Sequence, residues 1–424
     1  MTTPRLLRRP LERFRDQSPV LRGLLASTLV GTVGRGLFFT LTVIYMTRVV
    51  GLSALSVGAG LTIAGAVGVV ASFGGGYLAD RVGAKRLLVV ATAVMACGLL
   101  GYAVVDGFAS YLAVACVVVG SQGTAQSARS ALLARAFVGP ARVSARATMR
   151  VVTNVGIAIG TAVAGIALVV DDAAVYRGAL VVGGVLFLAS VVWIVRVPYV
   201  DPAPVPRVRG ERAPGRSPLR DRRYLAVTVL GAVTTVQFGL FEVGVPVWVT
   251  QHTEAPAAVV SVLLLMNTAI VIALQIPLSR GTHDVGGAGR ASLVGGLLMV
   301  VACALWAAAA TGSPVVAVVV LLAAAAAHSL AEVHLSAGGW GLGFELADPE
   351  RAGAYQGVYG TGSAIGGMLA PVVVTQTVIG LGTPGWIVLA SAFAAAGAGL
   401  WLVARRAAAG GPAADRGPGV GAAP

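Results

Sequence analysis

The feature that most constrains this chain is a succession of long apolar stretches with almost no charge inside them. A helix needs about 20 mostly apolar residues to cross a bilayer, and twelve stretches of that order follow one another between short polar segments. We expect transmembrane helices at 23–47, 53–78, 87–106, 110–134, 147–170, 177–196, 224–250, 256–278, 291–311, 314–340, 353–379 and 384–404. The predicted fold class is an all-α membrane protein.

The composition excludes a soluble globular protein. Hydrophobic residues make up 57% of the 424 residues, charged residues only 11%, and the mean hydropathy is +0.85, whereas soluble domains carry about 25% charge. The net charge of +14 does not indicate nucleic-acid binding, because the arginines gather between the apolar stretches, as in cytoplasmic loops. The three cysteines lie inside apolar stretches without metal-ligand spacing, so we expect neither a metal nor a cofactor.

The positions of the arginines also predict the topology and the domain boundaries. Residues 1–22 and 197–223 are rich in arginine, so we expect an N-terminal segment, a linker and both termini in the cytoplasm. Two sets of six apolar stretches occupy 23–196 and 224–405, and we expect the Ala/Gly/Pro-rich tail 406–424 to be disordered. The predicted location is the plasma (inner) membrane of a cell, with the lipid bilayer around the apolar stretches.

A compact charged block separates the second and third stretches. It reads Gly-x-x-x-Asp-Arg-x-Gly-x-Lys-Arg, with the members Gly76, Asp80, Arg81, Gly83, Lys85 and Arg86. The first glycine permits close helix approach, the second permits a tight turn, and the carboxylate can pair with an arginine or cap a helix. The block resembles the signature loop of the major facilitator superfamily of secondary transporters. That resemblance implies a gating role, against the alternative of a generic charged loop.

The two sets of stretches repeat one another. Matching residues lie 204 or 206 positions apart, namely Asp80, Gly83 and Arg86 with Asp284, Gly287 and Arg290, and Gly156 and Gly160 with Gly362 and Gly366. The resemblance to the superfamily implies two pseudo-symmetric six-helix bundles that transport by alternating access. It also implies a substrate site at their interface near the bilayer midplane.

Two carboxylates lie well inside predicted spans, where charge is costly and is usually functional. These are Glu242 and Glu332, and His328 precedes the latter by four residues, which puts both side chains on one helical face. The sequence predicts that this group carries protons, with structural pairing of His328 and Glu332 as the alternative. Gln122 and Gln126 hold the equivalent positions in the first half, so we expect them to line a shared central cavity.

Further candidates lie around the expected cavity. Arg35 is mid-span, and we expect it either to pair with a carboxylate or to meet an anionic substrate. Arg129 is nearer the cytoplasmic end and is expected to pair with Asp80 rather than to contact substrate. The remaining cavity candidates are Gln237, Tyr45 and Tyr359.

The fifth stretch is rich in small residues and resembles the glycine-rich helix-5 motif of exporters in this superfamily. Gly156 and Gly160 allow close packing and bending, and packing alone is the alternative role. Thr161 follows Gly160 where those exporters usually carry proline, and Val119 stands near the place of their proton-linked arginine. Both departures weaken the case for drug/proton exchange.

These features predict a monomeric secondary transporter that exports a small, drug-like organic molecule in exchange for protons. The sequence has no P-loop, HExxH or Gly-x-Ser-x-Gly motif, so we do not expect an enzyme, and we expect no nucleic-acid partner. An importer or facilitator for a nutrient or metabolite is the alternative of the same class. A non-transporting receptor or scaffold is the alternative of another class, and the intramembrane carboxylates favour transport over it.

Overall fold

The computed structural model of the chain describes residues 17–201 and 216–409, and within these ranges helices joined by loops make up the regular secondary structure. Twelve helices there are long and apolar enough to cross a membrane, which confirms the predicted fold class. The elements of the first half are α2 (Pro19–Ile44) with η1 (Tyr45–Val49), α3 (Ala54–Val82), α4 (Ala84–Gly101) with η2 (Tyr102–Val104), α5 (Phe108–Ala136), α6 (Pro140–Val170) and α7 (Ala173–Val195).

The second half repeats this order. Its elements are η3 (Pro218–Arg220), α8 (Arg222–Gly239) continued by η4 (Leu240–Gly244) and α9 (Val245–His252), α10 (Val259–Ser279), α11 (Val285–Ala308), α12 (Pro314–Glu345), η5 (Pro349–Arg351), α13 (Ala352–Val374) with η6 (Thr375–Ile379), and α14 (Thr383–Ala409). Of the predicted disordered tail 406–424, residues 406–409 are helical and belong to α14, which corrects the prediction there, and 410–424 lie outside the described residues. Much of the predicted segments 1–22 and 197–223 also lies outside the described residues.

The helix ends follow local chemistry as well as hydropathy. Ser18, Ser53 and Ser313 are N-caps whose side chains accept from the first turns of α2, α3 and α12, which satisfies backbone donors that lipid cannot satisfy. Gly83 separates α3 from α4 with φ +94°, a conformation that glycine adopts without strain. The predicted tight turn therefore forms at this glycine.

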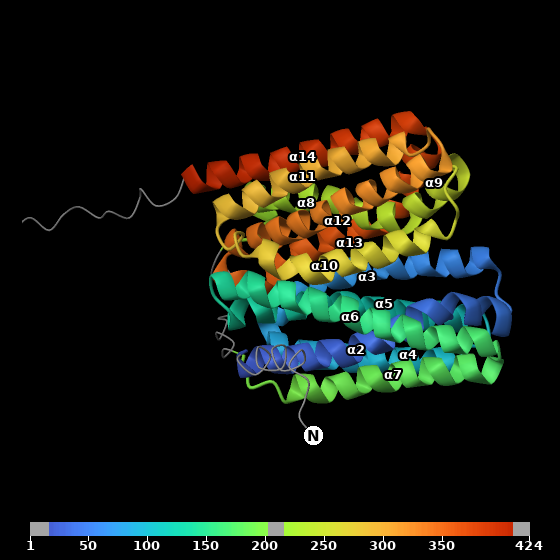
Figure 1. Cartoon of the computed structure of the whole chain (residues 1–424). Helices are drawn as coiled ribbons and strands as arrows, with labels where there is room; N and C mark the ends of the chain where they lie inside the picture. Colours follow the sequence, from blue (N-terminus) through green and yellow to red (C-terminus); the bar gives the residue numbers. More distant parts are fainter. Residues whose placement is uncertain (1–16, 202–215, 410–424) are drawn as a thin grey trace, which may run out of the picture.

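The chain folds into two helical bundles stacked side by side, α2–α7 and α8–α14 (Figure 1). Each bundle has its own core; in the second, Trp248 donates to the carbonyl of Trp306 at 2.8 Å and packs edge-on against Trp386. Large apolar side chains such as Val70 and Leu265 are exposed in the absence of lipid. Such side chains have an apolar environment only in a membrane.

Matching glycines bring matching helices together in the two bundles. Gly160 of α6 lies against the backbone of Val33 in α2, and Gly366 of α13 lies against the backbone of Ala232 in α8, so that a Cβ at either glycine would overlap a carbonyl oxygen. Gly156 and Gly362 lie equally close to the same partner helices. The four predicted packing glycines thus sit at two equivalent helix contacts, where only the smallest residue fits.

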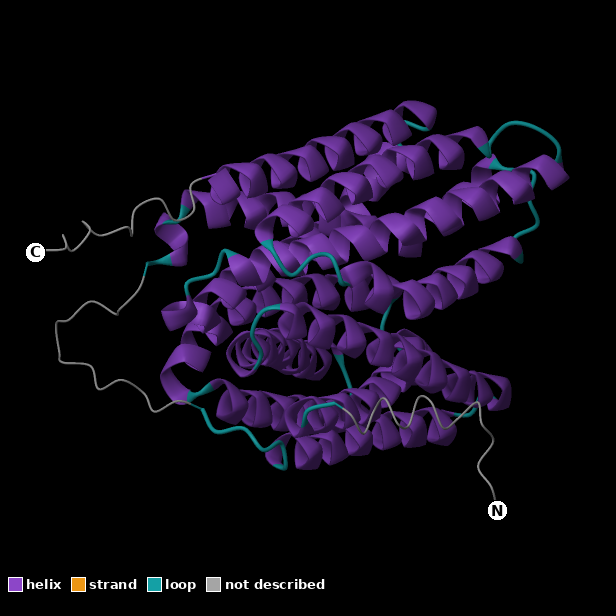
Figure 2. Cartoon of the chain, turned by 60° about the vertical axis from the view of Figure 1, so that its left-hand side comes forward, coloured by secondary structure: helices purple, strands orange, loops and turns teal. Residues whose placement is uncertain are grey.

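The charged loops gather at one end of the molecule. We call the end with the α3–α4, α5–α6, α10–α11 and α12–α13 loops the basic end, and the other the opposite end. Among the described residues, Arg48 and Arg177 are the arginines near the opposite end, and no lysine lies there. The basic end lies on the left in Figure 2.

Candidate functional site

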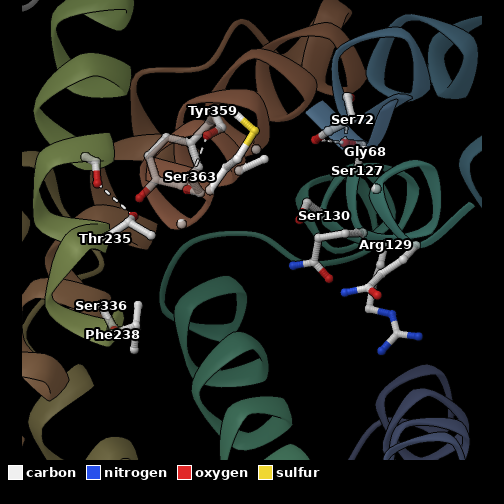
Figure 3. A pocket seen from close by; sticks show the side chains of 18 of the residues that line it. Gly68, Ser72, Ser127, Arg129, Ser130, Thr235, Phe238, Ser336, Tyr359 and Ser363 are labelled. Carbon is white, nitrogen blue, oxygen red and sulfur yellow. Dashed lines mark hydrogen bonds between the residues drawn. The ribbon is translucent and has the colours of Figure 1, made fainter. Parts of the chain in front are cut away.

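A cavity of about 910 Å³ lies between the two bundles. Its walls come from α2, α3, α5 and α6 on one side and from α8, α12 and α13 on the other. Figure 3 shows Arg129 and Ser130 on the wall of the first half, facing Phe238, Ser336 and Tyr359 on the wall of the second half. A volume of this size suits a small organic molecule.

Four arginines form the charged part of the first-half wall, namely Arg35, Arg129, Arg146 and Arg150. The last two belong to α6, which begins at Pro140, seven residues before the predicted start. Neither is among the candidates predicted from the sequence: Arg146 lies just before the predicted span 147–170, where an arginine is expected in a loop, and Arg150 lies just inside it. The usable signal is their spacing: Arg142, Arg146 and Arg150 recur every fourth residue and therefore share one helical face.

The four guanidinium groups differ in what they contact. Arg150 forms an ion pair with Glu332 at 2.7 Å. Arg129 donates to Thr28 Oγ1 at 3.2 Å, and Arg146 donates to Ser130 Oγ at 3.0 Å. Arg35 lies over the ring of Phe39, 4.9 Å from its centre. Arg35 lines the cavity, as predicted. Within the described residues, its guanidinium has no carboxylate within 4.0 Å.

The second-half wall is aromatic and neutral. Phe238 lies 4.9 Å from the guanidinium carbon of Arg150, and Trp340 lies 5.7 Å from that of Arg146. Tyr359 lines the same wall, as predicted from its position. Arg146 and Arg150 of α6 therefore each lie over an aromatic ring of the other bundle, a favourable cation–π arrangement.

Glu332 connects the two halves beside the cavity. Its side chain is only 5% exposed; Oε1 accepts from Arg150, and Oε2 accepts from Asn267 of α10 at 3.0 Å. Asn267 also donates to Ser329 at 3.0 Å, which fixes its orientation. A carboxylate of the second half is thus held by a cation of the first half, and its two oxygens have partners on different helices.

His328 is placed differently from the prediction. It is fully buried, its Nε2 lies 2.9 Å from Gln237 Oε1, and its ring packs edge-on against Phe241. It forms no hydrogen bond with Glu332, although the two share a helical face, so the pairing of the two side chains that stood as the alternative is not observed. Gln237 lines the cavity, as predicted, whereas His328 is not part of the wall. The histidine lies behind Gln237, to which it is hydrogen-bonded.

Glu242 lies in η4, a π-helical turn of the seventh span, a type of irregularity that is frequent at functional sites. It is not part of the cavity wall, but it is close enough to Arg35, Arg150 and Glu332 to interact with them electrostatically. Two carboxylates and two arginines thus form one charged group at the junction of the halves. The sequence analysis singled out three of the four and missed Arg150.

Asp80 joins the two bundles between the cavity and the basic end. Its carboxylate accepts from the backbone N–H groups of Gly353 and Ala354 in the first turn of α13, at 2.8 and 2.7 Å. It also pairs with Arg135, and not with Arg129 as predicted. Arg129 is two turns further into the span, where it faces the cavity instead.

The rest of the signature loop supports this contact. Gly76 lies against Gly353 and Gly357 of α13, so close that a Cβ would be 2.6 Å from the Cα of Gly357. Lys85 Nζ donates to the carbonyl of Val197 at 2.7 Å, which ties the loop to the end of α7. Arg81 and Arg86 are exposed.

A second ion pair joins the halves near the same end. Arg142 of α6 lies 3.4 Å from Glu345 at the end of α12, and its guanidinium lies over the ring of Phe344. Among the described residues, the hydrogen bonds that join the bundles involve this pair, Asp80 and Glu332. All of them lie at the basic end or beside the cavity, so the bundles are held together on that side.

The remaining candidates divide between the cavity and the core. Gln122 and Gln126 line the cavity, as predicted. Tyr45 does not: it is fully buried in the core of the first half, and its hydroxyl contacts Ala103 and Arg177. Its place near the opposite end, in η1, explains the difference. Within the described ranges, no three side chains of His, Cys, Asp or Glu come together in a way that could hold a metal ion.

Comparison with known families gives one match that spans most of the chain. A profile of the Major Facilitator Superfamily matches residues 24–371. An uncharacterized MFS-type transporter, YdeE of Escherichia coli, is 40% identical over 83 residues, and another, YqjV of Bacillus subtilis, is 30% identical over 80 residues. Each alignment covers about a fifth of this chain and about a fifth of the relative.

Solved structures with the same fold cover nearly the whole chain. The human organic anion transporter MFSD10 (TETRAN) superposes with a TM-score of 0.70 at 16% identity, covering 90% of this chain and 99% of its own. FucP in the outward conformation gives a TM-score of 0.64 at 14% identity, covering 91% and 98%. The proton:xylose symporter XylE gives 0.63 at 16% identity, covering 93% and 95%. At these identities the likeness concerns the fold.

Proposed function

The chain belongs to the Major Facilitator Superfamily, whose members move small molecules across membranes by alternating access, and on that premise we propose that it is a proton-coupled secondary transporter of a small organic molecule. The proposed substrate site is the cavity between the bundles. Its volume and its position at the interface of two repeated halves support this assignment.

The observation that carries the proposal is the ion pair of Arg150 and Glu332. It joins the two halves at 2.7 Å beside the cavity, with Glu332 almost completely buried. A carboxylate in that position can be charged and paired, or protonated and released, and the two forms stabilise the contact between the halves to different degrees. Protonation is thereby linked to the movement of one half against the other.

The contacts of Asp80 and of Arg142 with Glu345 supply the gate in this proposal. They hold the bundles together between the cavity and the basic end. If the positive-inside rule places the basic end in the cytoplasm, the structure corresponds to a state closed toward the cytoplasm. Transport then requires these contacts to break while the opposite end closes.

Export of a drug-like molecule in exchange for protons remains the direction predicted from the exporter-like glycines of α6. Uptake together with a proton is the second candidate, favoured by the fold likeness to XylE, which is a proton symporter. The sign of the proton movement separates them: in exchange, substrate and proton cross in opposite directions, and in cotransport they cross together. A receptor or scaffold would move neither.

The test uses the full-length protein in proteoliposomes with a trapped pH-sensitive dye. A panel of hydrophobic cations, amphiphilic antibiotics and aromatic anions is added, and the proton flux that depends on the added compound is recorded. The proposal expects a saturable flux with at least one compound, absent from protein-free liposomes. A protein that binds a panel compound but gives neither proton flux nor substrate movement would be a receptor, and the proposal would fail.

A further inference from the structure

The cavity carries a large excess of positive charge. Its wall contains Arg35, Arg129, Arg146 and Arg150, and the described residues that line it include no Asp, Glu or Lys. Of the four, only Arg150 has a carboxylate within 4.0 Å among the described residues. Placing unpaired guanidinium groups at membrane depth is costly. A bound anion would supply the missing negative charge.

The arginines have free hydrogen-bonding capacity at the cavity. Arg129 and Arg146 are each anchored to a hydroxyl group through one terminal nitrogen, to Thr28 and Ser130 respectively. The Nε atoms of Arg35 and Arg129 are buried without a hydrogen-bond partner. Guanidinium groups donate in a planar fork that matches carboxylate, sulfonate and phosphate oxygens. The first-half wall is therefore suited to bind such a group.

The second-half wall differs from the first in charge and polarity, and this difference indicates what the rest of the ligand is like. Charge is confined to the first half, whereas the second half presents Phe238, Trp340 and Tyr359 together with aliphatic side chains such as Leu335 and Met368. A ligand that matches both walls has an anionic head and an apolar or aromatic body. An organic cation would meet the arginines without any lining carboxylate to bind it.

We propose that the transported substrate is an amphiphilic organic anion, held by its charged head at Arg129, Arg146 and Arg35, with Arg150 added when Glu332 is neutral, and by its apolar body at Phe238, Trp340 and Tyr359. This inference rests on the proposed function and specifies the substrate class of the same site. It replaces the hydrophobic cations among the expected drug-like substrates with carboxylates, sulfonates and phosphates.

The ion pair of Arg150 gives the proposal a second consequence. Glu332 and a bound anion compete for the same guanidinium. Asn267, which also donates to Ser329, holds the Glu332 carboxylate in place, and Glu242 and Arg35 are the other charged neighbours. Neutralising Glu332 releases Arg150 to the anion. The proton and the anion therefore favour each other's binding, which corresponds to the cotransport outcome of the vesicle assay.

The test is a binding series with one aromatic body and three charges. The purified full-length protein is titrated with naphthalene-2-sulfonate, with the uncharged naphthalene-2-sulfonamide and with the cationic trimethyl(2-naphthyl)ammonium, and thermal stabilisation is recorded, since a ligand stabilises the state that binds it. 2-Naphthoate and 2-naphthyl phosphate extend the anionic arm. The expected result is saturable stabilisation by at least one anion, and affinities at least tenfold weaker for the amide and the ammonium ion.

Variants connect the binding to the arginines. Arg129→Gln and Arg146→Gln are expected to weaken anion binding at least tenfold, Arg129→Lys to retain most of it because the charge remains, and Arg290→Gln, at an exposed position of the basic end, to leave it unchanged. Glu332→Gln is expected to strengthen it about tenfold, since Arg150 is released. A structural role of these residues alone would not produce a gain of affinity.

Opposite outcomes overturn the proposal. It fails if the ammonium ion binds more tightly than all three anions, or if no anion binds at millimolar concentration. It also fails if Arg129→Gln and Arg146→Gln both bind the anions as the wild type does. In the first of these cases the proposed transport function still stands if the ammonium ion drives proton flux. Conversely, anion binding without any proton flux or substrate movement would retain the ligand class and refute proton-coupled transport.

Discussion

Replacement of Asp80 by asparagine is expected to open the basic end of the transporter. The carboxylate of Asp80 accepts two backbone N–H groups of α13, at 2.8 and 2.7 Å, from the opposite bundle. The first turn of α13 has no cap from its own N-cap residue, Arg351, so a residue of the other half supplies it. This cap exists only while the bundles are together at the basic end.

The size of the effect follows from these contacts. Hydrogen bonds to a charged group stabilise by about 1.5–3 kcal/mol each. Asparagine of the same shape keeps one neutral acceptor and turns its NH₂ group toward the second N–H, so the closed state loses about 3 kcal/mol. Each 1.4 kcal/mol corresponds to about a factor of ten, and the ratio of closed to open molecules is therefore expected to fall by roughly 100-fold.

Spin-label distances across each end measure this shift. Labels at Val138→Cys and Glu350→Cys span the basic end, and labels at Leu55→Cys and Leu381→Cys span the opposite end, all at exposed positions in a chain without its three native cysteines. Asp80→Asn is expected to lengthen the first distance and shorten the second. Unchanged distributions at both ends would refute the gating role of the cap.

The matched control is Asp284→Asn, the equivalent position in the second half. Asp284 caps α11 by accepting from Gly287 at 2.8 Å within its own bundle. Asparagine keeps this single acceptor and caps a helix about as well as aspartate, so this variant is expected to change thermal stability little and to shift neither inter-bundle distance. A shift of equal size in this variant would mean that the loss of an aspartate charge at either loop changes the equilibrium, and the argument for Asp80 would fail.

Two further predictions concern packing and topology. Gly160→Val is expected to lower the midpoint of thermal unfolding, because its side chain would overlap the backbone of α2 at a cost of about 1–3 kcal/mol or more. Gly165→Val, on the same helix, has open space around it and is expected to change the midpoint little. Equal midpoints for the two variants would refute the close-contact role of Gly160. A reporter fused after Ser217 is expected in the cytoplasm and one after Asp171 outside it, and finding both on one side would contradict an even number of spans in the first half.

Hydropathy was sufficient to predict the helices and the all-α fold class, because a lipid environment leaves few alternatives to apolar helices. The arrangement in two bundles was predicted from the internal repeat and the resemblance of the signature loop. The boundaries were less predictable where charge lies inside a span. α6 begins at Pro140 and α12 continues to Glu345, both beyond the predicted limits. The added turns of α6 carry Arg142 and Arg146, and Arg146 faces the cavity rather than the cytoplasm. Hydropathy cannot distinguish these two polar surroundings.

The partners of the candidate residues lie on other helices, so the spacing of residues along one helix does not predict them. The spacing of His328 and Glu332 correctly predicts one face, yet their partners come from α8 in one case and from α6 and α10 in the other. Similarly, Arg129 and Arg135 are both near Asp80 in the expected topology, and the axial offset of α5 against α3 decides between them. These offsets arise from the packing of whole helices.

The central claim, that Glu332 carries the coupling proton, is tested most directly by its glutamine variant in proteoliposomes. With the compound that gives the largest proton flux in the wild type, Glu332→Gln is expected to abolish accumulation driven by a pH gradient but to retain exchange of labelled for unlabelled compound, because glutamine keeps the size of the side chain and cannot change its charge. The same experiment on Glu242→Gln and on the double variant shows whether the neighbouring carboxylate contributes. Accumulation driven by the pH gradient at the wild-type level in the double variant would contradict the account.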